Sequence, residues 1–324
     1  MGMTHSLNAS LLNGSPAIDV RGLTKTYDGD VHAVRGIDFT VAPGEVFGLL
    51  GPNGAGKSTT VGMLTTTIRP TSGVARLAGY DVATHPLEAR RVSSVVFQES
   101  VLDRSLTGRR NLDVHARLWQ VDSHAHQEHL AELVEGFDLG DILDRPVDTF
   151  SGGQRRRLEI ARALLSSPKV LFLDEPTVGL DTRIRHELLD LIAGLRRRTD
   201  MTTLLTTHYL DEAERLCDRI AVMHSGAIVA LDSPQALVAR LGDDLLEVRV
   251  EGNAAVSFAL LRSRNVAGVD AFTLGSTIYL PLATASAPRT RALVEQLLPT
   301  STMLTRPPTL DDVYLHLTGD ALAA

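Results

Sequence analysis

The stretch G-P-N-G-A-G-K-S-T, residues 51–59, decides the fold of this protein. It fits the pattern G-x-x-x-x-G-K-[ST]. The apolar run V-F-G-L-L at 46–50 precedes it, and a helix-like segment follows. A buried strand that enters such a loop and leaves as a helix is a phosphate-binding arrangement. Glycines let backbone N–H groups close around phosphate oxygens, and the helix start adds positive potential.

This loop supplies the first candidate binding residues. Lys57 places a compact positive charge on the β- and γ-phosphates, and Ser58 binds Mg²⁺. Lysine is rare in this chain, since the others are only Lys25 and Lys169, which makes a lysine at this position more informative. The nucleotide-binding candidates in the loop are Gly51, Pro52, Asn53, Gly54, Ala55, Gly56, Lys57, Ser58 and Thr59.

A second stretch, V-L-F-L-D-E at 170–175, predicts a buried strand that ends in two acids. A strand end beside the phosphate loop is where a carboxylate can act on Mg²⁺. We assign Asp174 to the metal, through water, and Glu175 to the attacking water. Adjacent acids at a strand end are common, so the specificity of this pair comes from the phosphate loop.

Composition limits the possible partners. The 324 residues are 44% hydrophobic and 22% charged, which is typical of a globular protein. A net charge of -7 argues against a general nucleic-acid binder, which should carry a basic face. The arginine triplets 155–157 and 196–198 therefore indicate solvated helix faces or ion pairs with neighbouring acids. The single cysteine, Cys217, rules out an internal disulfide.

Buried strand patterns alternate with helical patterns along most of the chain. This alternation predicts an α/β fold with a mostly parallel sheet covered on both faces. A mainly helical insertion at about 99–165 interrupts this alternation of strands and helices. The predicted strands lie at 18–20, 31–41, 46–50, 92–97, 170–173, 202–207 and 220–223.

The character of the chain changes after Pro234. The remaining elements follow the order β-α-β-β-α-β and suggest a small ferredoxin-like domain of the α+β class, closed by a last helix in L-D-D-V-Y-L-H-L. They lie at 246–251, 254–262, 271–274, 277–282, 288–298 and 301–305. We predict a flexible tail at 1–16, a nucleotide-binding domain at 17–240 and this accessory domain at 241–324.

These ordered motifs resemble the nucleotide-binding subunit of an ATP-binding-cassette (ABC) transporter over about residues 17–240. The fold implied is a P-loop NTPase core with a helical signature subdomain. S-G-G-Q at 151–154 is similar to the family's signature motif, with Phe150 where the family usually has leucine. The resemblance implies that two subunits meet head to tail, the second expected to be a copy of the first. Ser151, Gly152, Gly153 and Gln154 of one would face the γ-phosphate bound to the other.

The remaining family motifs are recognised by position. Gln98, in V-F-Q-E, matches the glutamine that senses Mg²⁺ and the attacking water, and Tyr27 matches the aromatic residue that stacks on adenine. His208, in L-T-T-H-Y, matches the histidine that contacts the γ-phosphate. Asp181, in G-L-D, matches the loop between two active sites, although this chain has V-G where family members often have S-A. The resemblance thus implies catalytic roles for Glu175, His208, Gln98 and Lys57, and metal binding by Ser58, Gln98 and Asp174.

The resemblance implies an ATPase that uses ATP and Mg²⁺ to power transport. No apolar run reaches the length of a membrane span, about 18 to 20 residues. The channel would therefore be a separate integral-membrane permease, gripped by the helical insertion at the cytoplasmic face of the cell membrane. The C-terminal motif P-T-L-D-D-V-Y-L-H-L-T-G resembles the drug-exporter branch, such as the daunorubicin-resistance ATPases. This branch implies export of a drug-like or lipophilic compound.

Two other functions use this kind of subunit. One is a soluble ABC ATPase of translation or DNA repair. Translation-type members usually carry two cassettes and repair-type members a long coiled coil, whereas this chain has one phosphate loop and a short insertion. The other is a regulatory cassette that does not hydrolyse ATP. The presence of Glu175 and His208 weighs against it.

Overall fold

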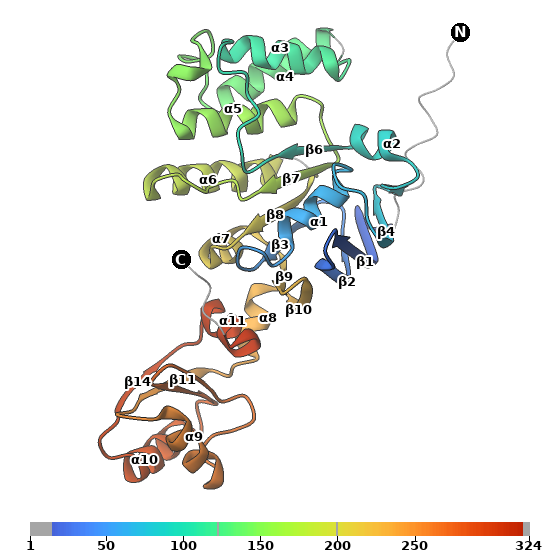
Figure 1. Ribbon diagram of the computed structural model, residues 1–324. Coiled ribbons are helices and arrows are strands. Elements are labelled where there is room, and N and C mark those ends of the chain that lie inside the picture. The colour runs from blue at the N-terminus through green and yellow to red at the C-terminus, as the bar shows by residue number, and fades with distance from the viewer. Residues whose placement is uncertain (1–14, 122, 199, 320–324) are drawn as a thin grey trace.

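The computed structural model describes residues 15–121, 123–198 and 200–319, so nearly all of the tail predicted at 1–16 lies outside the described residues. Its centre is a six-stranded sheet with the order β10-β9-β3-β8-β7-β6 (Figure 1). The strands β9, β3, β8, β7 and β6 are parallel, and β10 pairs antiparallel to β9. Their bounds are Val46–Leu50 (β3), Ser93–Val96 (β6), Val170–Asp174 (β7), Thr202–Thr207 (β8), Arg219–His224 (β9) and Ala227–Asp232 (β10). The predicted parallel sheet is confirmed.

Successive residues of these buried strands enter two different cores, because side chains alternate across a strand. In β7, Leu171 and Leu173 pack with α5, α6 and α7, whereas Val170 and Phe172 pack toward α1 and the N-terminal strands. The sheet therefore has apolar cover on both faces, as its continuous hydrophobic runs predict. The helices involved are Lys57–Leu64 (α1), Gly152–Leu164 (α5), Thr182–Arg198 (α6) and Leu210–Leu216 (α7).

A second sheet, which the sequence patterns did not reveal as a unit, is antiparallel with the order β2-β1-β4-β5. Its β1 is longer than the predicted 18–20 and reaches Tyr27, so that this tyrosine ends a strand. The bounds are Ile18–Tyr27 (β1), Val31–Val41 (β2), Ser72–Leu77 (β4) and Tyr80–Asp81 (β5), followed by the helix Pro86–Arg91 (α2). This sheet covers α1 from outside.

The chain between β6 and β7 forms the predicted helical insertion. It contains Gly108–Leu118 (α3), Ser123–Gly136 (α4), the short 3-10 helix Val147–Thr149 and α5. Figure 1 shows α3 and α4 as an outer layer, with α5 between them and the sheet. The insertion thus places the start of α5, where S-G-G-Q lies, beyond the sheet edge formed by β6.

The C-terminal elements form a third sheet with the order β12-β13-β11-β14, all antiparallel. Helices α9 and α10 lie on one face around a separate apolar cluster. The bounds are Asp244–Arg249 (β11), Ala254–Ser263 (α9), Phe272–Leu274 (β12), Thr277–Leu282 (β13), Ala287–Leu297 (α10) and Thr302–Arg306 (β14). The element order agrees with the predicted β-α-β-β-α-β.

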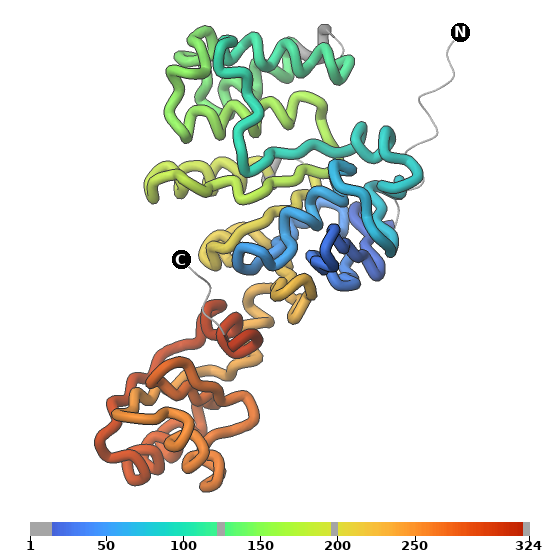
Figure 2. Tube along the Cα trace, in the orientation of Figure 1, coloured from blue at the N-terminus to red at the C-terminus, as the bar shows by residue number. Residues whose placement is uncertain are grey.

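The last helix, Leu310–Thr318 (α11), does not stay with that third sheet alone. Its buried Leu310, Val313 and Tyr314 belong to the core of the main body, where α11 contacts α7 and the helix Pro234–Ala239 (α8). In Figure 2 the red segment that forms α11 accordingly lies at the junction with the main body. The accessory region is therefore attached to the main body at both of its ends.

Candidate nucleotide-binding site

The phosphate loop joins β3 to α1 with a backbone that requires glycine. Gly56 is the N-cap of α1 with φ +102°, and a Cβ there would lie 2.5 Å from the carbonyl oxygen of Ala33. A Cβ on Gly51 would lie 2.3 Å from the carbonyl oxygen of Met223. No side chain caps α1, so the N–H groups of its first turn are open to an anion. The loop thus fits the phosphates of a nucleotide.

Lys57 lies at the centre of a buried charge cluster. Its side chain is 4% exposed, and its Nζ donates to the carbonyl oxygens of Gly51 (2.7 Å) and Pro52 (3.2 Å). The same Nζ lies 3.1 Å from Oε1 of Glu175, which is 5% exposed. His208 Nδ1 lies 3.3 Å from the other oxygen, Oε2. Three predicted catalytic residues therefore meet around one carboxylate.

Next to this cluster lies a set of oxygen ligands suited to Mg²⁺. Ser58 Oγ donates to Asp174 Oδ1 at 3.3 Å, and Thr206 Oγ1 donates to the same oxygen. Carboxylate and hydroxyl oxygens are the donors that Mg²⁺ takes in such sites. The predicted metal residues Ser58 and Asp174 are therefore in contact and fit the ion. Thr206 was missed from the sequence, where only the threonine-rich strand T-T-L-L-T-T marks it.

Glu175 has an unusual backbone. Its φ of +44° lies in the left-handed region, which non-glycine residues seldom occupy. Its N–H donates to Thr206 Oγ1 at 2.9 Å, which helps hold this conformation. Such conformations persist only where surrounding contacts enforce them, and they cluster at active sites.

Arg156 adds to one sequence interpretation. The triplet 155–157 was expected on solvated faces or in ion pairs with neighbouring acids, and such pairs form between Arg157 and Glu187 (2.8 Å) and between Arg156 and Glu159 (2.9 Å). The sequence did not predict that Arg156 is buried, at 6% exposed, and also donates to backbone carbonyls at the carboxyl end of β7. Its face of α5 packs directly over β6, which turns this one arginine inward. The side chains of the second triplet, 196–198, lie outside the described residues.

Two further predicted residues lie at or just beyond the end of a strand. Gln98 is exposed two positions beyond β6, whose Val96 pairs with Leu173 of β7. Because β6, β7, β8 and β3 are parallel, Gln98, Glu175, His208 and the phosphate loop all follow carboxyl ends of strands. Tyr27 ends β1, half-exposed, with Lys25 Nζ 4.9 Å from its ring centre.

The S-G-G-Q motif is built differently. Ser151 is the N-cap of α5, where its Oγ accepts from the Gln154 N–H (3.2 Å) and its own N–H donates to Gln154 Oε1 (2.9 Å). Gly153 is needed for packing, because a Cβ there would lie 2.4 Å from Ile184 Cγ2. Asp181 accepts from the N–H of Ile184 at the start of α6.

The chain does not bring S-G-G-Q to its own phosphate loop. In Figure 1, α1 lies among β3, β8 and β2, whereas α5 lies beyond β6 and β7 in the helical layer. Ser151 and Gly152 are exposed there. The predicted phosphate contacts of this motif therefore need a phosphate that is not bound to the loop of the same chain.

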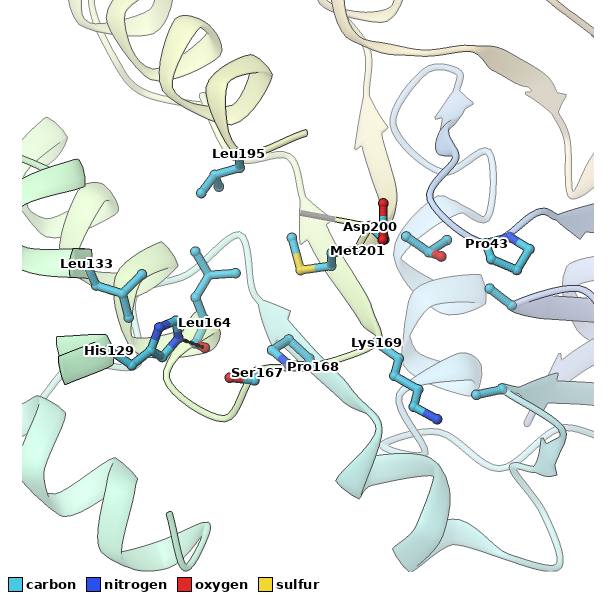
Figure 3. A pocket seen from close by; sticks show the side chains of 13 residues that line it. Pro43, His129, Leu133, Leu164, Ser167, Pro168, Lys169, Leu195, Asp200 and Met201 are labelled. Atoms are coloured by element: carbon cyan, nitrogen blue, oxygen red, sulfur yellow. Dashed lines mark hydrogen bonds between the residues drawn. The ribbon is translucent and has the colours of Figure 1, made fainter. Parts of the chain in front are cut away.

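Two of the larger cavities lie away from the phosphate loop. One, of about 430 Å³ and mostly apolar, lies where β7 and β8 begin, at the end of the sheet opposite to the charge cluster (Figure 3). The other, of about 470 Å³, is a groove between β6, α3 and α5, lined by His115, Trp119 and Arg162 among others. Burial, together with the nearby charge of Arg162, lowers the pKa of His115 to about 4. We call this second cavity the β6–α3 groove.

Comparisons with known proteins agree with this geometry. The family model described as "ABC transporter" matches residues 34–178. The daunorubicin/doxorubicin resistance ATP-binding protein DrrA of Streptomyces peucetius is 47% identical over 234 residues, covering 72% of this chain and 70% of the relative. The Nod factor export ATP-binding protein I of Burkholderia orbicola is 39% identical and covers 93% of this chain and 97% of the relative.

A solved structure supports the same fold. The cbiO1 protein of Clostridium perfringens, part of the ABC transporter complex cbiONQ, superposes with a TM-score of 0.64 and 27% identity. The match covers 69% of this chain and 91% of that one. Among the described residues, no helix is both long and apolar enough to cross a membrane. The phosphate loop, its acid pair and these relatives together place the chain in the ABC transporter family, as an ATP-binding subunit of the ATPase type.

Proposed function

We propose that this protein binds and hydrolyses Mg·ATP to drive export through a separate membrane permease. The observation that carries the proposal is the cluster in which Lys57 and His208 contact the two carboxylate oxygens of Glu175, beside a glycine-bounded phosphate loop. Phosphoryl transfer depends on positioning and on offsetting negative charge, and this cluster contains groups for both.

Each residue near the loop has a proposed part in hydrolysis. Glu175 orients the attacking water in line with the γ-phosphate, and Gln98 and His208 complete the polar ring around it. Lys57 offsets the charge that develops on the phosphate oxygens. Mg²⁺, when bound by Ser58, Asp174 and Gln98, supplies further positive charge at the phosphates. Tyr27 stacks on adenine.

We further propose that two copies of the chain meet head to tail. The exposed Ser151 and Gly152 of one copy would then face the phosphate held by Gly51–Thr59 of the other, with Asp181 between the sites. This pairing explains why an exposed glycine-rich helix start occurs far from the loop of its own chain. ATP bound between the copies would hold them together, and hydrolysis would let them part.

The β6–α3 groove is the proposed docking site of the permease. His115 Nε2 and Arg162 Nε are buried there and have no hydrogen-bond partner within the described residues. Exposed apolar side chains flank it on α3, where Leu118 is 76% exposed and Val114 is also exposed. A cytoplasmic loop of a membrane protein could cover the apolar surface and supply the missing hydrogen-bond partners. Such docking would hold the protein at the cytoplasmic face of the membrane, which is the location we propose.

The relatives named for drug resistance and for Nod factor export favour an exporter, and none of the relatives described above is named for translation or DNA repair. We propose a drug-like or lipophilic substrate on this basis. We also propose the division into a nucleotide-binding domain at 17–240 and an accessory domain at 241–324, with α11 fastening the second to the first.

The test of the ATPase is a comparison of the wild-type protein with Glu175→Gln. Removing the carboxylate should lower kcat by about a hundredfold or more, because positioned acid–base groups contribute about that factor. ATP binding should persist, and ATP should then trap a dimer visible by size-exclusion chromatography. Normal hydrolysis by Glu175→Gln would refute the assignment of this acid.

Export is tested in inside-out vesicles that contain both this chain and a permease encoded beside it. Daunorubicin should accumulate in the vesicles with ATP and the wild-type chain, and not with Glu175→Gln. If the chain hydrolysed ATP but no daunorubicin accumulated in vesicles that contain the permease, the ATPase activity would stand and the transport role would be refuted.

A further inference from the structure

The guanidinium of Arg156 lies where three separate segments meet. Its Nε donates to the carbonyl oxygen of Pro176 at 2.5 Å, and one terminal nitrogen donates to that of Phe97 at 2.6 Å. The other terminal nitrogen donates to the carbonyl oxygens of Glu175 at 3.0 Å and Asp174 at 3.4 Å. Arg156 thus joins α5 to the end of β7 and to the segment that leads from β6 to Gln98.

No other side chain type can make these contacts together. Arginine presents five N–H donors in one rigid plane, whereas lysine has a single ammonium point and glutamine only two donors. Arg156 is buried, and its charge is balanced by Glu159 Oε2 at 2.9 Å, one turn along α5. A buried, paired arginine that spends its other donors on backbone carbonyls fixes the path of that backbone.

The backbone that it fixes carries the hydrolytic acid. Glu175 has the strained φ of +44°, with its N–H held by Thr206 and its carbonyl oxygen held by Arg156. Phe97, bound by the same guanidinium, immediately precedes Gln98. The two proposed water-positioning residues therefore share one anchor on α5.

We propose that Arg156 is a positioning residue that couples the S-G-G-Q helix to Glu175 and Gln98 of its own chain. The proposal rests on the function proposed above. In a head-to-tail dimer, Ser151 at the start of α5 faces the nucleotide of the partner, while Arg156 on the same helix holds the acid of its own site. A phosphate bound at one site thereby sets the catalytic geometry of the other.

The experiment compares Arg156→Gln and Arg156→Lys with Arg157→Gln in the full chain. Arg157 is a matched control, since its guanidinium on the same helix pairs with Glu187 instead. We expect Arg156→Gln to lower kcat about a hundredfold, because a displacement of about 1 Å can cost that much. The ATP Kd, measured with a fluorescent ATP analogue, should change less than about threefold, since the hydrogen bonds of Arg156 described above all go to groups outside α1 and its loop. Arg156→Lys should recover little, and Arg157→Gln should match the wild type.

Positive cooperativity between the two sites gives a readout that a merely structural role would not move. The ATP dependence of the wild-type rate should have a Hill coefficient above 1, and that of Arg156→Gln should fall to 1. A variant with unchanged kcat and unchanged cooperativity would overturn the coupling role. If the wild type itself hydrolysed no ATP, the proposed function would fail first, so the two failures are distinguishable.

If Arg156→Gln fails to fold and therefore binds no ATP, a second experiment measures Arg156→Ala with added guanidinium, which replaces the missing side-chain group. The guanidinium ion is kept below the concentration that begins to unfold the wild type. Recovery of kcat with guanidinium supports the positioning role. Recovery of ATP binding and thermal stability without recovery of kcat would overturn it.

Discussion

The helices α1 and α5 both begin at glycine-rich motifs, but the two starts are prepared for a phosphate in different ways. The N-cap of α1 is Gly56, and no side chain caps the helix. The N-cap of α5 is Ser151, which exchanges two hydrogen bonds with Gln154. The first start has open N–H donors, while the second is partly satisfied by its own side chains before any ligand arrives.

The charges around the two starts differ as well. Lys57 and Glu175 are buried beside α1, so a phosphate there meets strong and weakly screened interactions. Ser151 and Gly152 at α5 are exposed and uncharged. The comparison teaches that α1 can hold a nucleotide by itself, whereas α5 adds a weaker, conditional contact. A weak contact at the second site would suit the proposed dimer, which opens after each cycle of hydrolysis.

The largest effect should come from breaking the α1 site. Lys57→Ala removes the ammonium that faces the phosphates, and it leaves Glu175 buried without its cation. We expect the ATP Kd to rise about a hundredfold, as for the loss of a desolvated charge contact. Titration with a fluorescent ATP analogue measures this. Lys169→Ala, which changes an exposed lysine where β7 begins, is the matched control, and an equal loss there would contradict the assignment.

Changes at the α5 site should affect ATP-dependent dimerisation rather than the binding of ATP to a single chain. Ser151→Asp keeps a good N-cap but sets a negative charge against the phosphate of the partner, whereas Ser151→Asn keeps the cap without the charge. In a Glu175→Gln background, we expect the aspartate to weaken ATP-dependent dimerisation about tenfold and the asparagine to preserve it. Analytical ultracentrifugation with ATP provides the measurement. If the aspartate lowered ATP affinity of the single chain to the same extent, S-G-G-Q would belong to its own loop.

Substitutions at the two glycines of S-G-G-Q should lower the stability of the protein by different amounts. A Cβ on Gly153 would overlap Ile184, whereas one on Gly152 would lie 3.3 Å from Leu180 Cδ2, a side chain that can move. We expect Gly153→Ala to lower the free energy of unfolding by about 2 kcal/mol, as overpacking does, and Gly152→Ala by less than about 0.5 kcal/mol. Urea denaturation checks both. Equal free energies of unfolding for the two variants would contradict the prediction, because α6 would then have moved away from the new methyl group at little cost.

The smallest effect concerns His115, which lines the β6–α3 groove beside the far end of α5. Because the pKa of His115 is about 4 in the folded chain and ordinarily 6.5, the unfolded chain binds more protons between these values. The stabilisation that comes from keeping His115 uncharged should therefore be present above pH 6.5 and be lost as the pH falls toward 4. The contribution of His115 should be about 1 kcal/mol after solvent screening. His115→Gln should show a shallower fall in Tm over this range, and parallel curves for both proteins would contradict it.

Much of the site followed from local sequence. The phosphate loop and the pair Asp174-Glu175 were predictable, because each is a short motif attached to the end of one buried strand. His208 was found through the family resemblance, and the structure brings it to 3.3 Å from Glu175 because parallel strands end at one edge of the sheet. The stacking role of Tyr27 and the contact role of Asp181 stay predictions.

Other features depended on contacts between distant segments. Thr206 sits among similar threonines, and nothing in its neighbourhood distinguishes it before β8 pairs with β7. The second sheet needed β1 to pair with β2 and with the later β4. The attachment of α11 to α7 and α8 joins residues that are far apart in the chain.

The sequence by itself determined the chemistry of this protein: a strand, a glycine-rich loop with Lys57, a helix, and two acids at a strand end. These are short-range patterns, and their physical requirements are met within a few residues. Only the tertiary structure decided which arginine of 155–157 turns inward, because successive side chains of a helix point about 100° apart and packing selects the buried one. It also separated S-G-G-Q from the loop of its own chain, since the helical insertion carries α5 beyond β6.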